Sequence, residues 1–208
     1  MDIDVFDDPT HGQQQLIFFH GYYKQYQYLV RAITCAENDL VVLPALLYGT
    51  ADPALGVGLD LERIVDALRE KFPHVVIHVR ADSGYAKPWF YRVCERLDVL
   101  YSIGVGMNNV LKRNSEELLK TAVEECEKTG QPQQLFTGFD YQAGTWEQPR
   151  WIVVKCEANA QGTNRRAIVT NRPGARTLPH GAYDEYSERG ESENRNKELK
   201  CDLCADRL

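Results

Sequence analysis

The sequence has no hydrophobic run long enough to form a membrane-spanning helix. Such a helix needs about 20 consecutive apolar residues, and no stretch of these 208 residues approaches that length. The N-terminus also lacks a basic segment followed by an apolar one, which would mark a secretion signal. We therefore expect a soluble, cytoplasmic protein that has no membrane partner.

Cysteine is too scarce to build a disulfide framework. The six cysteines are scattered through a chain that can bury a sizeable core without covalent cross-links, so we expect reduced thiols. Cys201 and Cys204 form a Cys-x-x-Cys pair. Since no second Cys or His pair stands at zinc-finger spacing, a helix end is the favoured interpretation and a zinc site is the alternative.

An overall excess of positive charge is also absent, since the formal net charge is −6. This value argues against a protein that is coated in basic charge for binding nucleic acid. The charges are unevenly distributed, however. Between Arg150 and His180 there are six basic residues against one acid, Glu157, which gives this stretch a net charge of +5. A local basic surface is compatible with the acidic remainder.

Apolar patterns in the first half of the chain predict an antiparallel meander followed by alternating helices and strands. Strands are expected over 2–6, 15–20, 26–35, 75–79 and 99–105, with a further apolar stretch over 40–48. Helices are expected over 60–72 and 88–97, where apolar residues fall on one helical stripe or follow a proline. The order strand, helix, strand predicts an α/β fold.

The second half of the chain predicts a small sheet between two helices. A charged helix is expected over 114–128, and strands over 134–142, 151–158 and 166–171 are separated by Gly, Pro and Asn turns. A last helix is expected from about Tyr183 to the C-terminus, with Gly190 tolerated in its first turns. The three strands then form a β-rich insertion before this helix.

Two acidic residues stand where α/β sheets commonly bind ligands. Asp82 follows a hydrophobic run and precedes a Ser-Gly turn, and Asp4 lies within the first predicted strand. Open α/β sheets bind their ligands just beyond strand ends, although a turn-capping role also explains Asp82. Asp2 shares a strand face with Asp4, so either of them is a candidate for the first working acid.

The last predicted helix carries a stripe of polar residues. At 100° per residue, Tyr186, Arg189, Glu193 and Lys200 fall within a sector about 60° wide, and Lys197 lies beside it. On periodicity alone, a solvated face held by pairs such as Glu193 with Lys197 is the favoured interpretation.

The spacing of these residues nevertheless resembles a known motif. Tyr186, two residues, Arg189, three residues, Glu193, six residues and Lys200 match the Tyr-Arg-Glu-Lys motif of DDE transposases from bacterial insertion sequences. The segments Asp2-Ile-Asp-Val-Phe and Arg80-Ala-Asp-Ser-Gly-Tyr resemble the two aspartate strands of that family. The resemblance covers essentially the whole chain.

The resemblance implies a ribonuclease H-like mixed sheet flanked by helices, with the β-rich insertion before the last catalytic helix. The expected divisions are a first part of the catalytic core over 1–107, an insertion subdomain over 108–180 and the motif helix of the core over 181–208. The N-terminal DNA-binding region and the C-terminal remainder of such transposases are expected to be absent, as in a truncated copy.

The resemblance also implies the chemistry and the partners. Asp4, Asp82 and Glu193 would be the ligands of two divalent ions, Mg²⁺ or Mn²⁺, for DNA strand cleavage and transfer. Hard oxygen ligands suit these ions, and a two-metal site suits in-line phosphoryl transfer. The implied partners are the terminal inverted repeats of a transposon and a target DNA, in a complex compatible with a homodimer.

Several residues are candidates for binding that DNA. The resemblance assigns the transposon end to Tyr186, Arg189 and Lys200, and Lys197 is a further candidate because it joins their stripe. The basic stretch offers Arg165 and Arg166 as a second surface. Trp146 and Trp151 are candidates for stacking on an unpaired base, although core packing of the inserted sheet is the favoured interpretation.

Two other functions stay open. A non-catalytic DNA-binding or inhibitory fragment of a transposase would bind duplex DNA and show no metal-dependent cleavage. A different ribonuclease H-like nuclease would cut without requiring inverted repeats.

Overall fold

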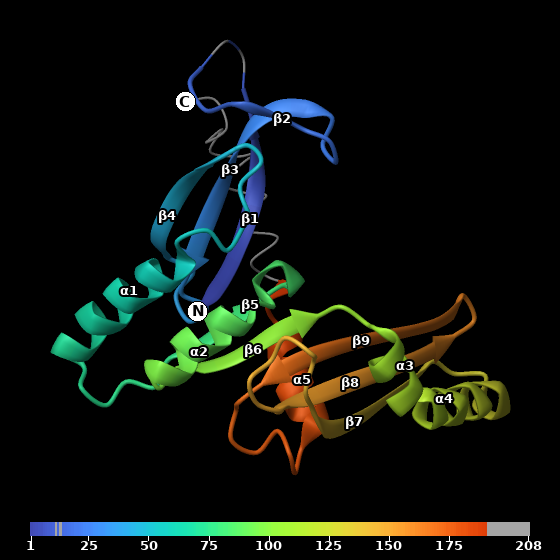
Figure 1. Cartoon of the computed structure of the whole chain (residues 1–208). Coiled ribbons are helices and arrows are strands. Elements are labelled where there is room, and N and C mark those ends of the chain that lie inside the picture. Colours follow the sequence, from blue (N-terminus) through green and yellow to red (C-terminus); the bar gives the residue numbers. More distant parts are fainter. Residues whose placement is uncertain (11, 13, 191–208) are drawn as a thin grey trace. The chain divides into compact units, whose positions relative to one another are not determined.

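The protein is an α/β protein, as expected. A computed structural model of the whole chain, shown in Figure 1, describes residues 1–10, 12 and 14–190. This described part falls into two compact units: Met1–Tyr85 with the segment that starts at Glu188, and Ala86–Ser187. No helix of the described residues is long and apolar enough to cross a membrane. The four cysteines of the described part are free thiols, and Cys201 and Cys204 lie outside it.

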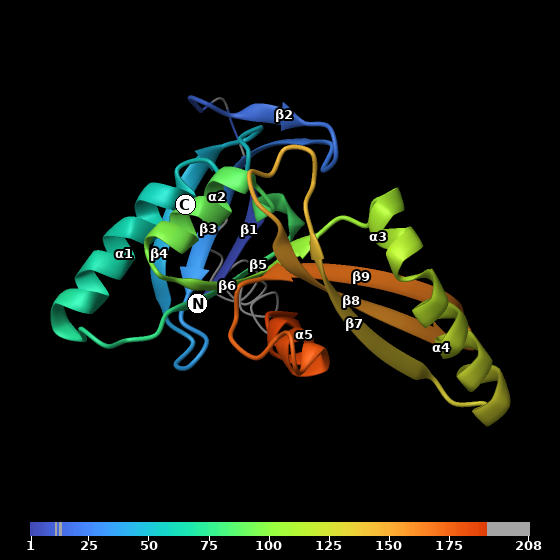
Figure 2. The ribbon, with the colours of Figure 1, turned by 60° about the horizontal axis from the view of Figure 1, so that its bottom comes forward.

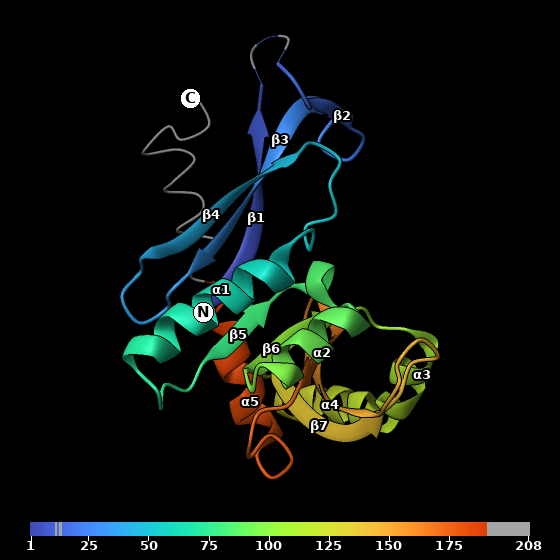
Figure 3. The same ribbon diagram turned by 60° about the vertical axis from the view of Figure 1, so that its left-hand side comes forward.

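The sheet of the first unit is built around one long central strand, β3. Its strands are β1 (Asp2–Pro9), β2 (Phe18–His20), β3 (Gln25–Thr34), β4 (Val41–Tyr48) and β5 (His78–Ala81). Strand β3 pairs antiparallel with β1 on one side and with β2 and β4 on the other, and β1 pairs parallel with β5. Figure 3 shows β1, β3 and β4 side by side. The strands β1, β3 and β4 form an antiparallel meander. The meander expected from the first three strands is wrong in its order, however, because β2 pairs with β3 and not with β1, and β2 is shorter than expected.

Helix α1 (Val57–Lys71) covers part of this sheet through an apolar stripe and one ion pair. Its residues Val57, Leu61 and Val65 are fully or almost fully buried, and they are spaced four apart on one face. Asp60 on the same helix accepts a hydrogen bond from the buried Arg31 of β3. The helix is therefore held against the meander by both apolar burial and charge.

Strand β5 begins three residues later than the sequence pattern predicts. The β-branched run indicated a strand over 75–79, but Val76 is 76% exposed and the strand runs from His78 to Ala81. The pairing of β5 with β1, rather than the apolar run, fixes these limits. Arg80 consequently lies inside the strand.

The sheet of the second unit is antiparallel, in the order β6-β9-β8-β7. Its elements are α2 (Pro88–Arg96), β6 (Leu100–Val105), α3 (Asn109–Asn114), α4 (Glu116–Thr129), β7 (Gln133–Tyr141), β8 (Arg150–Asn159), β9 (Gly162–Thr170) and α5 (Pro179–Ser187). The charged helix expected over 114–128 corresponds to α4. The three strands expected between 134 and 171 are confirmed as β7, β8 and β9.

Helices α4 and α5 pack on opposite faces of this sheet. Cys156 of β8 donates to the carbonyl of Ser115 at the start of α4, and Figure 2 shows α4 running along β7 and β8. Tyr183 of α5 packs instead on Val153 of β8 and Ile168 of β9. Since successive strand residues point to opposite faces, Cys156 and Val153 belong to different faces.

The last helix differs from the prediction in the described residues. Helix α5 begins at Pro179 rather than near Tyr183, and it ends at Ser187. Glu188 and Arg189 form a turn, so Tyr186 and Arg189 do not lie on one continuous helix. Ion pairs made by both turn residues favour this break.

Candidate catalytic site

The strands β1 and β5 bring the two candidate aspartates next to each other. Asp2 is paired with Arg80, and Ile3 is paired with Ala81, in a parallel register. If this register is continued by one residue, Asp4 of β1 is opposite Asp82, which directly follows the end of β5. Neighbouring strands lie about 4.8 Å apart, and register partners in a parallel pair point to the same face. Two acids that are 78 residues apart in sequence therefore share one end of the sheet.

The structure separates the roles of Asp2 and Asp4. Asp2 lies in a buried two-point ion pair, in which Arg80 Nε donates to Oδ1 at 2.6 Å and Nη2 donates to Oδ2 at 2.9 Å. The side chain of Asp2 is only 2% exposed, whereas that of Asp4 is 15% exposed. Because the Asp2 carboxylate is almost inaccessible to a ligand, the more exposed Asp4 is the better candidate for a working acid.

Asp82 closes the turn that follows β5. Its Oδ1 accepts a hydrogen bond of 2.9 Å from the Gly84 amide, at the start of the 3₁₀ turn Ser83–Tyr85. A Cβ on Gly84 would come within 3.0 Å of this oxygen, so the glycine allows the close approach. The turn-capping role and a catalytic role are compatible, because a carboxylate has further lone pairs for a cation.

The pKa of Tyr85 is affected by both candidate carboxylates. The side chain is fully buried, and this burial raises the pKa of its phenol. Arg31 lowers that pKa, whereas the negative charges of Asp82 and Asp4 both raise it. One phenol therefore experiences the charge of both carboxylates and stays neutral beside them.

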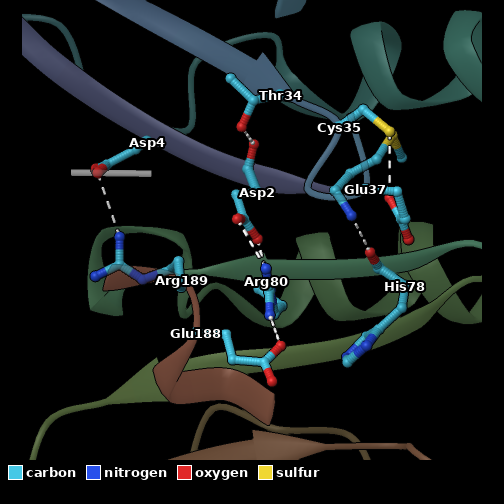
Figure 4. Close-up of polar contacts among 10 residues, drawn as sticks. Asp2, Asp4, Thr34, Cys35, Glu37, His78, Arg80, Glu188 and Arg189 are labelled. Carbon is cyan, nitrogen blue, oxygen red and sulfur yellow. Dashed lines mark hydrogen bonds and ion pairs between the residues drawn. The ribbon is translucent and has the colours of Figure 1, made fainter. Parts of the chain in front are cut away.

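Arg189 is placed against Asp4, as Figure 4 shows. Its Nη1 donates to Asp4 Oδ2 at 3.3 Å, while the Val5 amide donates to Oδ1 at 2.9 Å. The Arg189 side chain is 13% exposed, so this ion pair is largely shielded from water. The arginine of the predicted motif thus lies at the candidate site, where its guanidinium forms an ion pair with Asp4.

Glu188, the residue before Arg189, is tied to the same pair of strands. Its carboxylate accepts a hydrogen bond of 3.1 Å from Arg80 Nη1. Arg80 and Glu188 were not among the candidates from the sequence. The two-residue strand period could have pointed to Arg80, since it places Arg80 on the same face as Asp82.

The described part of this site fits a divalent cation only as an incomplete ligand set. Among residues 1–190, apart from 11 and 13, no group of three His, Cys, Asp or Glu side chains is gathered closely enough to hold a metal. Asp4 and Asp82 supply hard carboxylate oxygens, and the Arg189 cation beside Asp4 indicates a site that favours positive charge. Glu193, Lys197 and Lys200 lie outside the described residues.

Arg165 and Arg166 point to opposite faces of the second unit's sheet. Arg165 donates to Glu116 Oε2 at 2.9 Å and to the Lys112 carbonyl at 2.8 Å. Arg166 is exposed on the α5 face, where its charge lowers the otherwise raised pKa of Tyr183. The two arginines thus cannot contribute equally to one surface.

Most of the basic stretch is neutralised within the second unit. Carboxylates pair with five of its six basic residues, namely Arg150, Lys155, Arg165, Arg172 and Arg176. Four of these partners lie outside the stretch itself, at Glu95, Glu116, Glu185 and Asp140. The net charge counted along the sequence therefore overstates the positive surface, and Arg166 is the basic residue of this stretch for which the described part shows no ion pair.

Both tryptophans of this region make packing contacts within the second unit. Trp146 is 8% exposed and lies edge-on to Tyr91 and Tyr141. Trp151 packs over Gly138, where an added Cβ would come within 2.5 Å of its ring. The guanidinium of Arg176 stacks on the Trp151 ring at 4.2 Å. These contacts agree with the packing interpretation, and base stacking stays a prediction.

Tyr186 also packs on the sheet of the second unit, beside Tyr183 at a ring distance of 5.8 Å.

The chain matches a known protein family over its whole length. A family model described as "Transposase DDE domain group 1" matches residues 1–208. No curated protein matches the sequence.

Proposed function

Because this chain belongs to the transposase DDE domain group 1 family, we propose that it is a transposase catalytic domain that cuts and joins DNA strands with divalent metal ions. The family supports phosphoryl transfer on DNA as the reaction class. The proposal assigns the first two catalytic positions to Asp4 and Asp82, and the third to Glu193.

The observation that carries this proposal is the register of β1 and β5. Carboxylates from two strands meet at one sheet end, and the arginine of the motif segment contacts one of them. A solvated helix face would not bring Arg189 to Asp4. This contact therefore favours the catalytic interpretation of the motif over the exposed stripe that periodicity alone favoured.

The topology supports a ribonuclease H-like core. In the first unit, the antiparallel strands β1, β3 and β4 are followed by α1 and by β5, which is parallel to β1. This order places Asp4 on β1 and Asp82 directly after β5, the parallel neighbour of β1. We assign β7, β8 and β9 to the inserted β-rich region.

Asp4, Asp82 and Glu193 would hold two Mg²⁺ or Mn²⁺ ions. Two such ions would activate the attacking hydroxyl and stabilise the leaving oxygen of the phosphodiester. Asp82 has a second oxygen beside the one that accepts the Gly84 amide, and Asp4 Oδ2 is already the partner of a cation. Both side chains can therefore present an oxygen to a cation without losing their backbone contacts.

Contact with DNA is assigned to the motif residues and to Arg166. Arg189 can pair with a phosphate once its charge is no longer needed on Asp4, because a guanidinium matches phosphate geometry. Tyr186, Lys197 and Lys200 are proposed to bind the transposon end. Arg166 is the exposed basic residue on the α5 face that can add a phosphate contact.

The test is metal-dependent nicking of supercoiled plasmid DNA by the 208-residue chain. We expect nicking with Mn²⁺, and its loss in Asp4→Asn and in Asp82→Asn, which retain an oxygen acceptor but remove a charge. Glu147→Gln, which removes an exposed carboxylate paired with Arg92 in the second unit, is the control and should keep wild-type nicking. DNA binding without nicking would contradict the catalytic assignment and favour a DNA-binding fragment.

A further inference from the structure

Arg80 contacts two separate carboxylates with three different nitrogen atoms. Nε and Nη2 bind the two oxygens of Asp2, and Nη1 binds Glu188. Arg80 is 6% exposed, so its charge is almost completely withdrawn from water. Figure 4 shows the guanidinium between the two acids. The fixed fork of a guanidinium allows this arrangement, which a lysine ammonium could not reproduce with the same geometry.

The three residues of this network each stand next to a residue of the candidate catalytic site. Asp2 precedes Asp4 by two positions on β1, and Arg80 precedes Asp82 by two positions at the end of β5. Glu188 directly precedes Arg189. The network therefore joins the three chain segments that carry the proposed catalytic residues.

We propose that Arg80 is a positioning residue for the catalytic centre, which sets the motif segment against the two aspartate strands through Glu188. This inference rests on the proposed function. The Asp2–Arg80 pair holds the two strands in register, and the Glu188 contact fixes the residue from which Arg189 reaches Asp4. Glu193 follows Arg189 by four residues, so the start of the segment that leads to the third carboxylate is also set by this contact.

A purely structural role for Arg80 makes a different prediction for Glu188. The Glu188 side chain is 70% exposed, and an exposed ion pair contributes little to stability. Under the structural alternative, removing its charge changes neither folding nor the site. Under the proposal, the fold is retained but metal affinity falls, because partners that orient ligands typically affect metal affinity 10- to 100-fold.

The experiment measures the affinity of the 208-residue chain for Mn²⁺ by the electron paramagnetic resonance signal of the free ion. The variants are Glu188→Gln and Arg80→Lys. Each is compared with a matched control in the same buffer and well below its melting temperature. Glu147→Gln is the control for an exposed carboxylate paired with arginine, and Arg31→Lys is the control for a buried arginine paired with aspartate in the first unit.

We expect Glu188→Gln to weaken Mn²⁺ binding about 10-fold with an unchanged melting temperature, and Glu147→Gln to bind as the wild type does. Arg80→Lys should weaken Mn²⁺ binding at least as much, whereas Arg31→Lys should lower the melting temperature and keep the affinity. If Arg80→Lys does not fold, Glu188→Gln still tests the positioning role of Arg80, because Glu188 is exposed.

The outcomes separate this inference from the proposed function. If the wild type binds Mn²⁺ and Asp82→Asn loses it, the metal site exists; wild-type affinity in Glu188→Gln would then overturn the positioning role of Arg80. If the wild type itself does not bind Mn²⁺, both the metal site and the positioning role fail together.

Discussion

The guanidinium of Arg189 lies 3.3 Å from Asp4 Oδ2, although 185 residues separate them in sequence. Both side chains are at most 15% exposed, so water screens the attraction between the two charges only weakly. In the proposed site a divalent cation competes with Arg189 for the same oxygen. The arginine is then available to a DNA phosphate when metal is bound.

Arg189→Gln should therefore destabilise the protein in a metal-dependent way. Without divalent metal, we expect the free energy of unfolding to fall by about 2 kcal/mol, because a charge-assisted hydrogen bond to the partly buried Asp4 carboxylate is lost. With saturating Mn²⁺ the loss should shrink, since the cation compensates Asp4. Urea denaturation with and without Mn²⁺ measures both values. An equal loss under both conditions would contradict competition at Asp4.

Tyr91 and Tyr101 offer a matched pair of substitutions in the second unit. Their rings stack at 5.4 Å, and Tyr101 donates to Glu95 Oε1 at 2.9 Å, whereas the buried Tyr91 hydroxyl has no partner among the described residues. Tyr101→Phe should lower the free energy of unfolding by about 1 kcal/mol, and Tyr91→Phe should raise it by about 1 kcal/mol. If both substitutions lowered the free energy of unfolding by the same amount, the difference between the two hydroxyl groups would be contradicted.

Cys94 predicts a pH dependence at the alkaline end. Burial raises the pKa of its thiol from 9.0 to about 12. The native state therefore keeps a proton that the unfolded state releases above pH 9. The contribution of the protonated thiol to the stability of the native state is complete below pH 9 and is lost as the pH rises towards 12. Between pH 8 and pH 10 the free energy of unfolding should fall by about 1 kcal/mol less in Cys94→Ala than in the wild type. Urea denaturation under reducing conditions tests this difference, and parallel curves would refute it.

Arg165 and Arg166 should have separable effects on DNA binding and folding. Arg166→Ala should weaken binding to all duplexes and lower the slope of log affinity against log salt by about 1, because one phosphate contact is lost. Arg165→Ala should mainly lower stability, since it loses Glu116 and the Lys112 carbonyl. Salt titrations of DNA binding distinguish them; an unchanged slope in Arg166→Ala removes this residue from the interface.

The sequence was sufficient to predict elements whose limits depend on local pattern. Periodicity and turn residues were enough to predict the stripe of α1 and the strands β1, β3, β7, β8 and β9. The order of the first strands in the sheet was not predicted, because β2 pairs with β3 and not with β1. The acids Asp4 and Asp82 were also identifiable, because one lies in a strand and the other at a strand end.

Features that depend on distant partners were missed. The burial of Arg80 requires Asp2, which is 78 residues away. The apolar pattern that predicted the strand ends at residue 79 and therefore leaves Arg80 out. The turn at Glu188 and Arg189 interrupts a stripe that periodicity joins into one helix, because both side chains bind residues of β1 and β5. Likewise, the charge count of the basic stretch could not reveal its pairing with Glu95, Glu116, Glu185 and Asp140.

The most direct test of the central claim is a metal titration followed by thermal melting of the wild type and Glu193→Gln. A ligand that binds only the folded state stabilises it by about 2.7 kcal/mol when its concentration is 100 times its dissociation constant. The melting temperature of the wild type should therefore rise with Mn²⁺. Without metal, Glu193→Gln should be as stable as the wild type or slightly more so, because one of three crowded carboxylates is neutralised. With Mn²⁺ its shift should be clearly smaller, while the control Glu147→Gln shifts as the wild type does. Identical metal-induced shifts in the wild type and Glu193→Gln would contradict the assignment of Glu193 as the third ligand beside Asp4 and Asp82.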